Sequence, residues 1–135
     1  MMRKTAPILI VDDDVEDHVI LEDYFSDLGL KHYLQFASDG KTALELLEGL
    51  ADNELPEIIV LDLNMPILNG TQTLLELKRS LRYKEIPVII YSTSENDNEK
   101  SKCLSFGALD YVVKPSDYES GMKTVQYLRS LVKNF

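Results

Sequence analysis

The sequence has little cysteine and no long apolar run. Cys103 is the only cysteine among 135 residues, so an intrachain disulfide is excluded and a reducing compartment is the simple inference. The uninterrupted apolar runs reach only four to six residues, far fewer than the ~18 needed to span a bilayer. Residues 1–7 lead into one short apolar run and contain no signal-peptide core. These absences predict a cytoplasmic protein without a membrane segment.

Positive charge is also scarce. The chain has 14 Lys and Arg against 23 Asp and Glu, a net charge of −9. Because binding to nucleic acid needs a basic face that neutralises phosphates, we expect no direct contact with nucleic acid. An acidic surface suits a partner with basic patches or a bound metal cation, and it equally serves solubility alone.

The length and composition describe one ordinary globular domain. A chain of 135 residues matches the usual size of a single domain, ~100–200 residues. Hydrophobic residues make up 44% and charged residues 27%, and neither a linker nor a repeat interrupts the chain. We therefore expect one domain over residues 1–135.

Short apolar runs alternate with amphipathic segments along the chain. Four runs are continuous and rich in β-branched residues, as strands buried on both faces of a parallel sheet are; they cover residues 8–11, 58–61, 88–91 and 109–113. A fifth, less apolar run at 32–37 predicts an edge strand. The predicted helices cover residues 15–28, 39–50, 70–81 and 95–106, with a last one opening at a capping box over 116–119. This alternation predicts an α/β domain with a parallel sheet.

The predicted helices differ in their apolar faces. The first has a stripe of Val19, Ile20, Tyr24 and Leu28, and the last has a core stripe of Met122, Val125, Leu128 and Val132. The last helix adds Tyr127, Leu131 and Phe135, which form either a wide buried stripe or a contact site for a partner or a second copy of the chain. The helix at 95–106 is polar almost throughout, so we expect it to be weakly held and able to shift.

Polar side chains follow four of the five predicted strands. They comprise Asp12, Asp13 and Asp14, then Asp62, then Ser92, Thr93 and Ser94, and finally Lys114. In open α/β sheets the carboxyl ends of the strands form the ligand-binding edge. Asp14 and Ser94 are also suited to cap the helices that follow. Capping explains Asp12, Asp13, Asp62 and Lys114 less well, because these residues stand at strand ends.

Three carboxylates that meet at one edge repel one another unless a cation or a proton intervenes. Oxygen ligands without a nearby His or Cys favour a hard cation such as Mg²⁺. Lys114 would add a second positive charge, and the Ser92 hydroxyl could donate to an added oxyanion. A carboxylate nucleophile, Mg²⁺, an ammonium and a hydroxyl are the groups that phosphoryl transfer to an aspartate requires.

Together these motifs resemble the receiver domain of bacterial response regulators, the CheY-like family. The matching residues are Val11-Asp12-Asp13, residues 60–66 with Asn69-Gly70, then Ser92 and Lys114-Pro115, and the resemblance runs from about residue 8 to residue 132. It implies a flavodoxin-like, doubly wound fold with five helices and a five-stranded parallel sheet in the order 2-1-3-4-5. In that order the first and third strands are neighbours, so Asp13 and Asp62 would face each other.

The resemblance also assigns roles to residues. Asp62 would be the phosphoacceptor, Asp13 a direct ligand of Mg²⁺ or Mn²⁺, Asp12 a ligand acting mostly through water, and Asn64 a ligand through its backbone carbonyl.

The remaining roles concern the phosphoryl group. Ser92 and Thr93 would bind it, Lys114 would pair with its oxygens, and Tyr111 would be the aromatic switch residue. The Lys114–Pro115 peptide bond would be cis, a state that is tolerable only before proline.

No output domain follows this pattern, so we expect a stand-alone receiver. It would accept a phosphoryl group from a histidine kinase and then signal through protein contact, or pass the group to a phosphotransfer protein. The Asp39-Gly40 pair, the long segment at 50–56 and Ser92-Thr93-Ser94 resemble small regulators that are paired with phytochrome-type kinases. The output surface would comprise residues 95–106, the fifth strand and the last helix, with a homodimer through that helix as one form of contact.

Two other functions are less well supported. A phosphatase of the haloacid dehalogenase type needs a second Asp two residues after its nucleophile, but Asn64 stands there and neither gives nor takes a proton at neutral pH. A degenerate receiver that only binds partners would not need the full set of acidic, hydroxyl and ammonium groups. We therefore expect a phosphoacceptor signalling domain, not an enzyme.

Overall fold

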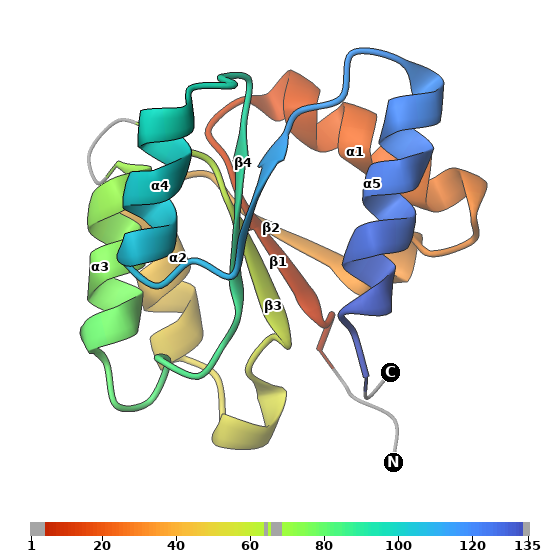
Figure 1. The fold of residues 1–135 in the computed structure, drawn as a ribbon. Coiled ribbons are helices and arrows are strands. Elements are labelled where there is room, and N and C mark those ends of the chain that lie inside the picture. Colours follow the sequence, from red (N-terminus) through yellow and green to blue (C-terminus); the bar gives the residue numbers. More distant parts are fainter. Residues whose placement is uncertain (1–4, 64, 66–68, 134–135) are drawn as a thin grey trace.

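The computed structural model describes residues 5–63, 65 and 69–133, and these form one five-stranded parallel sheet in the order β2-β1-β3-β4-β5 (Figure 1). The strands are β1 Ile8–Val11, β2 Leu34–Ala37, β3 Ile58–Leu61, β4 Val88–Ser92 and β5 Asp110–Val113. The predicted fold class and strand order are therefore confirmed.

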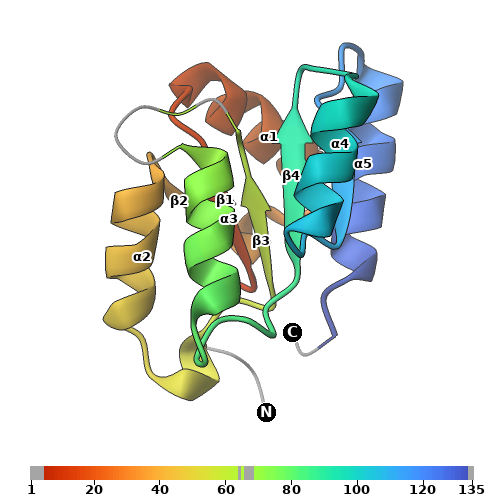
Figure 2. The same cartoon turned by 60° about the vertical axis from the view of Figure 1, so that its left-hand side comes forward.

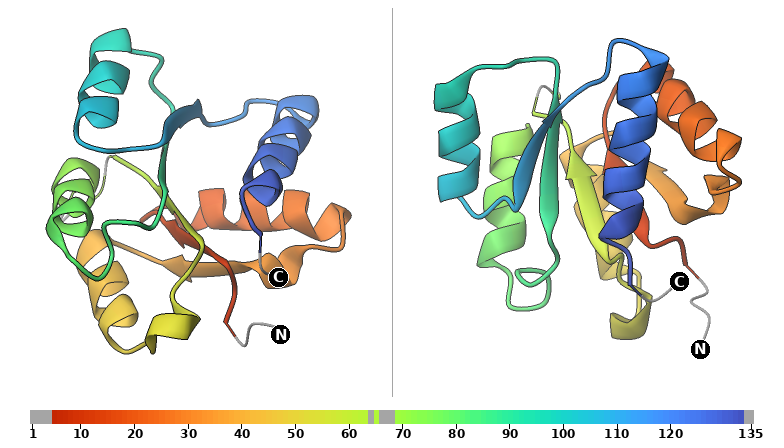
Figure 3. Two further views of the ribbon diagram at one scale, coloured as in Figure 1. Left: turned by 60° about the horizontal axis from the view of Figure 1, so that its bottom comes forward. Right: turned by 45° about the vertical axis from the view of Figure 1, so that its right-hand side comes forward.

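Helices cover both faces of the sheet. They are α1 Val15–Asp27, α2 Gly40–Glu48, α3 Gly70–Arg79, α4 Asp97–Ser105 and α5 Tyr118–Ser130. Figures 1, 2 and 3 show α1 and α5 on one face and α2, α3 and α4 on the other. Short 3-10 turns at Lys31–Tyr33 and Asp52–Glu54 complete the connections. No helix among the described residues is both long and apolar enough to cross a membrane.

The two-sided cover explains why the central strands are apolar without interruption. In β1, Ile8 and Ile10 pack toward α1 and α5, whereas Leu9 and Val11 pack toward the opposite face. All four side chains of β1 and of β3 are buried, while three of the four in β2 are only half-buried. The expectation that the 32–37 segment forms an edge strand is thus confirmed, although residues 32 and 33 belong to the 3-10 turn.

The buried face of α1 differs from the predicted stripe. Leu21 and Phe25 are buried, whereas Val19 and Ile20 are about half-exposed, at 51% and 47%. A close approach between α1 and α5 explains the orientation: a Cβ atom on Gly121 would lie 2.4 Å from the Tyr24 ring. With Tyr24 packed against α5 in this way, Leu21 and Phe25 face the sheet.

Of the two predicted helix caps, Asp14 and Ser94, only Ser94 needs correction. Asp14 caps α1 as expected, accepting hydrogen bonds from the backbone of the first turn. Ser94 does not cap α4. The N-cap is Asn96, whose side chain accepts from the N–H of Glu99. The Ser94 hydroxyl instead accepts from the N–H of Asn96, before the helix begins.

The last helix begins later than the capping-box pattern at 116–119 predicts. Its N-cap is Asp117, whose carboxylate accepts from the N–H of Ser120 at 2.7 Å. Hydrogen bonds from the backbone N–H and the side-chain hydroxyl of Ser120 lower the pKa of the Asp117 carboxyl.

The extra apolar residues of α5 complete the core. Tyr127 and Leu131 are half-buried against the apolar cluster between the sheet and the helices α1 and α5, and the Tyr127 hydroxyl donates to Asp110 Oδ2 at 2.6 Å. The wide-stripe interpretation therefore holds for these two residues, and the idea that they form an exposed contact is wrong. Phe135 lies outside the described residues.

Helix α4 differs from the other helices, because Cys103 is the one buried residue among its nine. This small burial agrees with its polar sequence, and its weak attachment stays a prediction.

Candidate functional site

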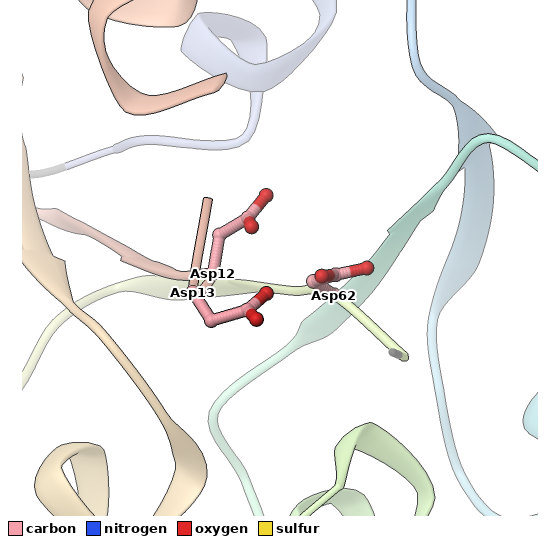
Figure 4. A group of neighbouring side chains, drawn as sticks. All are labelled: Asp12, Asp13 and Asp62. Carbon is pink, nitrogen blue, oxygen red and sulfur yellow. The ribbon is translucent and has the colours of Figure 1, made fainter. Parts of the chain in front are cut away.

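The ends of β1 and β3 bring three carboxylates together. The strands pair in register, Val11 beside Leu61, and the N–H of Asp62 donates to the carbonyl of Val11 at 2.9 Å. Ligand oxygens of Asp12, Asp13 and Asp62 all lie within 4.8 Å of one another (Figure 4). Asp12 and Asp62 are buried, whereas Asp13 is exposed. The cluster therefore opens to solvent on the side of Asp13, and its all-oxygen donor set fits a hard divalent cation.

Asp12 is held on both of its carboxylate oxygens. Oδ1 accepts from the N–H of Asp14 at 2.9 Å, and Oδ2 accepts from Lys114 Nζ at 2.9 Å. The backbone carbonyl of Asp12 accepts from His18 Nε2 at 2.5 Å, and the His18 ring stacks on Phe36. These contacts fix the end of β1.

Lys114 brings a positive charge among the carboxylates. The N–H of Lys114 donates to the carbonyl of Ser92 at 2.7 Å, which places it beside the end of β4. Its ammonium lies 2.7 Å from Asp17 Oδ2, 2.9 Å from Asp12 Oδ2 and 3.7 Å from Asp62 Oδ1. Burial lowers the pKa of Lys114, but hydrogen bonds to Asp17 and Asp12 raise it further, so the net pKa lies above its ordinary value. The ammonium therefore remains charged.

Asp17 was not among the predicted site residues. This residue lies in the first turn of α1, where an acidic side chain is usually explained by the helix dipole alone. Its contact with Lys114 joins residues 97 positions apart. The available signal is that the first turn of α1 directly follows Asp12 and Asp13, so a side chain there can reach the same edge of the sheet.

A second group of oxygens lies where β4, β5 and α4 meet. Ser92 Oγ accepts from the N–H of Ser94 at 3.1 Å and lies 3.5 Å from Glu99 Oε1. The Tyr111 hydroxyl lies 2.5 Å from the same Glu99 oxygen and 3.0 Å from the carbonyl of Ser94. Burial, and then the hydrogen bond to Glu99, raise the pKa of the Tyr111 phenol. Glu99 was not predicted as a site residue either, because it stands in a helix that is polar almost throughout.

The remaining predicted site features are Thr93, Asn64 and the Lys114–Pro115 peptide bond. Thr93 lies after β4 with an exposed side chain. Asn64 lies outside the described residues. The prediction of a cis Lys114–Pro115 bond is wrong, since no peptide bond among the described residues is cis. The trans form of such a bond is favoured by ~0.5–1 kcal/mol, and in this form Lys114 already reaches Asp12 and Asp17.

Gly70 allows α3 to begin directly beside Asp62. The N–H of Gly70 donates to the carbonyl of Leu63 at 3.0 Å. A Cβ atom at position 70 would lie 2.2 Å from the backbone oxygen of Asp62, so a larger residue would displace either the helix or the segment that holds Asp62.

Comparisons with known proteins identify this arrangement. The family model for the response regulator receiver domain matches residues 8–126. The chain is 34% identical to protein PilH of Pseudomonas aeruginosa over 120 residues, which cover 89% of this chain and 94% of PilH. By contrast, it spans about a third of the length of related protein-glutamate methylesterases.

Solved structures agree with this result. The response regulator RPA3017, in red light signaling of R. palustris, has a TM-score of 0.81 and 30% identity, with 95% of this chain and 94% of that chain covered. The Mn²⁺-bound form of response regulator Rcp1 has a TM-score of 0.76 and 28% identity, with 91% of each chain covered. The chain therefore belongs to the response regulator receiver domain family, whose members are signalling domains of two-component systems.

Proposed function

We propose that this receiver accepts a phosphoryl group on Asp62 from the phosphohistidine of a histidine kinase. The supporting observation is the placement of Asp62 beside two further carboxylates and an ammonium, at the end of a buried strand. Both carboxylate oxygens of Asp12 accept hydrogen bonds, from the N–H of Asp14 and from Lys114, so attack through either oxygen would break one of these bonds. Asp13 is exposed, so the charge that develops during transfer would be less well shielded from water there.

Phosphoryl transfer replaces the phosphorus–nitrogen bond of phosphohistidine with a phosphorus–oxygen bond to Asp62. An Asp62 carboxylate oxygen attacks phosphorus, the phosphorus–nitrogen bond to the imidazole breaks, and the imidazole keeps the electron pair and takes up a proton. Lys114 Nζ, 3.7 Å from Asp62 Oδ1, would pair with one phosphoryl oxygen. The Ser92 hydroxyl would donate to another. Both contacts act on charge that the incoming group brings to the site.

A divalent cation fits the same pocket. Asp12, Asp13 and Asp62 would hold Mg²⁺ or Mn²⁺, and the expected fourth protein ligand, the Asn64 carbonyl, lies outside the described residues. The cation would offset negative charge on the carboxylates and on the phosphoryl oxygens. The Mn²⁺-bound form of Rcp1 supports this assignment.

The kinase would dock over the start of α1. The helix α1 begins directly after the acidic cluster and carries three exposed apolar residues, Val15, Val19 and Ile20. Contact with an apolar surface of the kinase would remove these side chains from water.

A phytochrome-type kinase is the donor class we propose, with support from the likeness to RPA3017. The signal would end in protein contact or in onward transfer to a phosphotransfer protein. A homodimer through the last helix stays a prediction, now without Tyr127 and Leu131 as exposed contacts.

Radiolabel transfer tests the proposal. A histidine kinase labelled on its histidine is mixed with the chain and Mg²⁺, and the label is followed on gels. We expect label to move to the wild type and to Asp23→Asn, which removes an exposed carboxylate of α1, but not to Asp62→Asn. Equal labelling of Asp62→Asn and the wild type would contradict the assignment.

A further inference from the structure

Glu99 joins three structural elements at a position that the proposed phosphotransfer does not explain. It lies in the first turn of α4, and its Oε1 atom accepts from the Tyr111 hydroxyl of β5 at 2.5 Å. The same oxygen lies 3.5 Å from the Ser92 hydroxyl at the end of β4. Ser92 is fully buried, so bulk water does not replace this acceptor.

These contacts matter more for α4 than they would for another helix. Cys103, in the second half of α4, is the only buried residue among its nine. The first half of α4 therefore has little apolar attachment, and Glu99 ties it to the sheet through polar contacts. Loss of one such contact would change the position of a helix that little else restrains.

We propose that Glu99 is a positioning residue that holds Ser92 and Tyr111 in the unphosphorylated arrangement and competes with a phosphoryl group on Asp62 for the Ser92 hydroxyl. The hydroxyl has one hydrogen, so it donates either to Glu99 or to the phosphoryl oxygen. When the phosphoryl group takes this hydrogen, Glu99 retains its contact with Tyr111 but loses its contact with Ser92, which is one of the two polar contacts that Glu99 makes with the strands. This inference rests on the proposed function of Asp62.

The competition is electrostatic as well as geometric. Glu99 and a phosphoryl group are both anionic, and both act on the one donor between them. A hydrogen bond to a charged acceptor is stronger than one to a neutral acceptor. Replacing Glu99 with Gln retains the shape and an acceptor oxygen but weakens the hold on Ser92.

Binding of beryllofluoride with Mg²⁺ tests the competition, because this group mimics the phosphoryl group without covalent transfer. We expect Glu99→Gln to bind it about fivefold more tightly than the wild type, which corresponds to the usual difference between charged and neutral acceptors. Asp97→Asn is the matched control: Asp97 is exposed in the same first turn, so its loss removes the same helix-terminal charge without touching Ser92. The control should bind as the wild type does.

A double-mutant cycle with Ser92→Ala isolates the hydroxyl. In the Ser92→Ala background, Glu99→Gln should have no more effect on affinity than Asp97→Asn. NMR of the Tyr111 ring without beryllofluoride gives an independent readout, and Glu99→Gln should shift it while Asp97→Asn does not.

The outcomes separate the two proposals. Equal beryllofluoride affinity of Glu99→Gln and the wild type would overturn the competition, whatever the Tyr111 ring shows. An effect of Glu99→Gln that persists in full without the Ser92 hydroxyl would overturn it too. A wild type that binds no beryllofluoride would contradict the proposed function, and the competition with it.

Discussion

The ammonium of Lys114 allows several acidic side chains to share one edge of the sheet. It contacts Asp12 and Asp17 directly and lies 3.7 Å from Asp62. It also lies 5.6 Å from the centre of the Tyr91 ring, which shields it on one side. A charge that is held by two carboxylates and remains near the third is well placed to move toward a phosphoryl group when one arrives.

Gly70 gives a residue-scale prediction about the support of Asp62. In Gly70→Ala the added methyl group would meet the Asp62 backbone at about the 2.2 Å found for a Cβ atom. We expect a loss of about 1–3 kcal/mol in the free energy of unfolding, as for other overpacked sites, together with slower labelling of Asp62. Urea unfolding and intact mass measure the two effects.

Gly49→Ala is the matched control for this change. Gly49 has a right-handed helical backbone at the end of α2, and a Cβ there would lie no closer than 3.6 Å to its neighbours. This variant should retain the stability and labelling of the wild type. If both alanine variants behaved alike, close approach at position 70 would not be the cause.

Tyr127 gives a prediction about pH. Burial, and then the hydrogen bond to Asp110, raise the pKa of Tyr127 to about 12, above the ~10 of an unfolded tyrosine. The folded state therefore binds this proton more tightly, so its contribution to stability is complete below pH ~10 and is lost as the pH rises toward ~12. Tyr127→Phe should lose less stability over this interval than the wild type in urea unfolding. Parallel losses in the two proteins would show that Tyr127 is not responsible.

At the scale of elements, the central strands and the core stripe of α5 were predictable, whereas the buried face of α1 was not. β1 and β3 have the predicted bounds. A continuous run of four apolar residues, rich in β-branched side chains, is too short for a typical helix and suits a strand covered on both faces. The apolar pattern of α1 is wider than its buried face, so Val19 and Ile20 seemed as suitable for the core as Leu21 and Phe25. The contact of Tyr24 with Gly121 decides between them, and it joins parts of the chain far apart in sequence.

The same distinction applies to the candidate site. Asp12, Asp13, Asp62 and Lys114 were predictable because each follows a strand, and strand ends meet at one edge. Asp17 and Glu99 were not, because each reaches its partner from a helix. A side chain in the first turn of a helix is equally well explained by capping or by the helix dipole.

The weak attachment of α4 gives a prediction at this scale. With Cys103 as its one buried residue, α4 should open locally at lower free energy than α1 or α5, each of which buries at least two large apolar side chains. Native-state hydrogen exchange should show the amides of α4 exchanging faster than those of α5. Equal protection of the two helices would mean that contacts other than apolar burial hold α4.

At the scale of the whole molecule, the acidic cluster links metal binding to stability. The net charge of −9 and the three clustered carboxylates favour any cation that binds the folded state. Mg²⁺ at ten times its Kd should add about 1.4 kcal/mol to the free energy of unfolding and raise the Tm by a few degrees. Asp13→Ala, which changes an exposed side chain, should fold normally and lose this response. A Tm that does not rise with Mg²⁺ would count against the metal site.

The central claim is that Asp62 is the phosphoacceptor, and intact mass spectrometry with a small phosphodonor tests it most directly. The wild type, incubated with acetyl phosphate or phosphoramidate and Mg²⁺, should gain the mass of one phosphoryl group and lose it again in hydroxylamine, as an acyl phosphate does. Asp62→Asn should gain none, while Asp23→Asn should match the wild type. A phosphoryl group that still adds to Asp62→Asn at the wild-type rate, or a wild type that never gains one, would contradict this account.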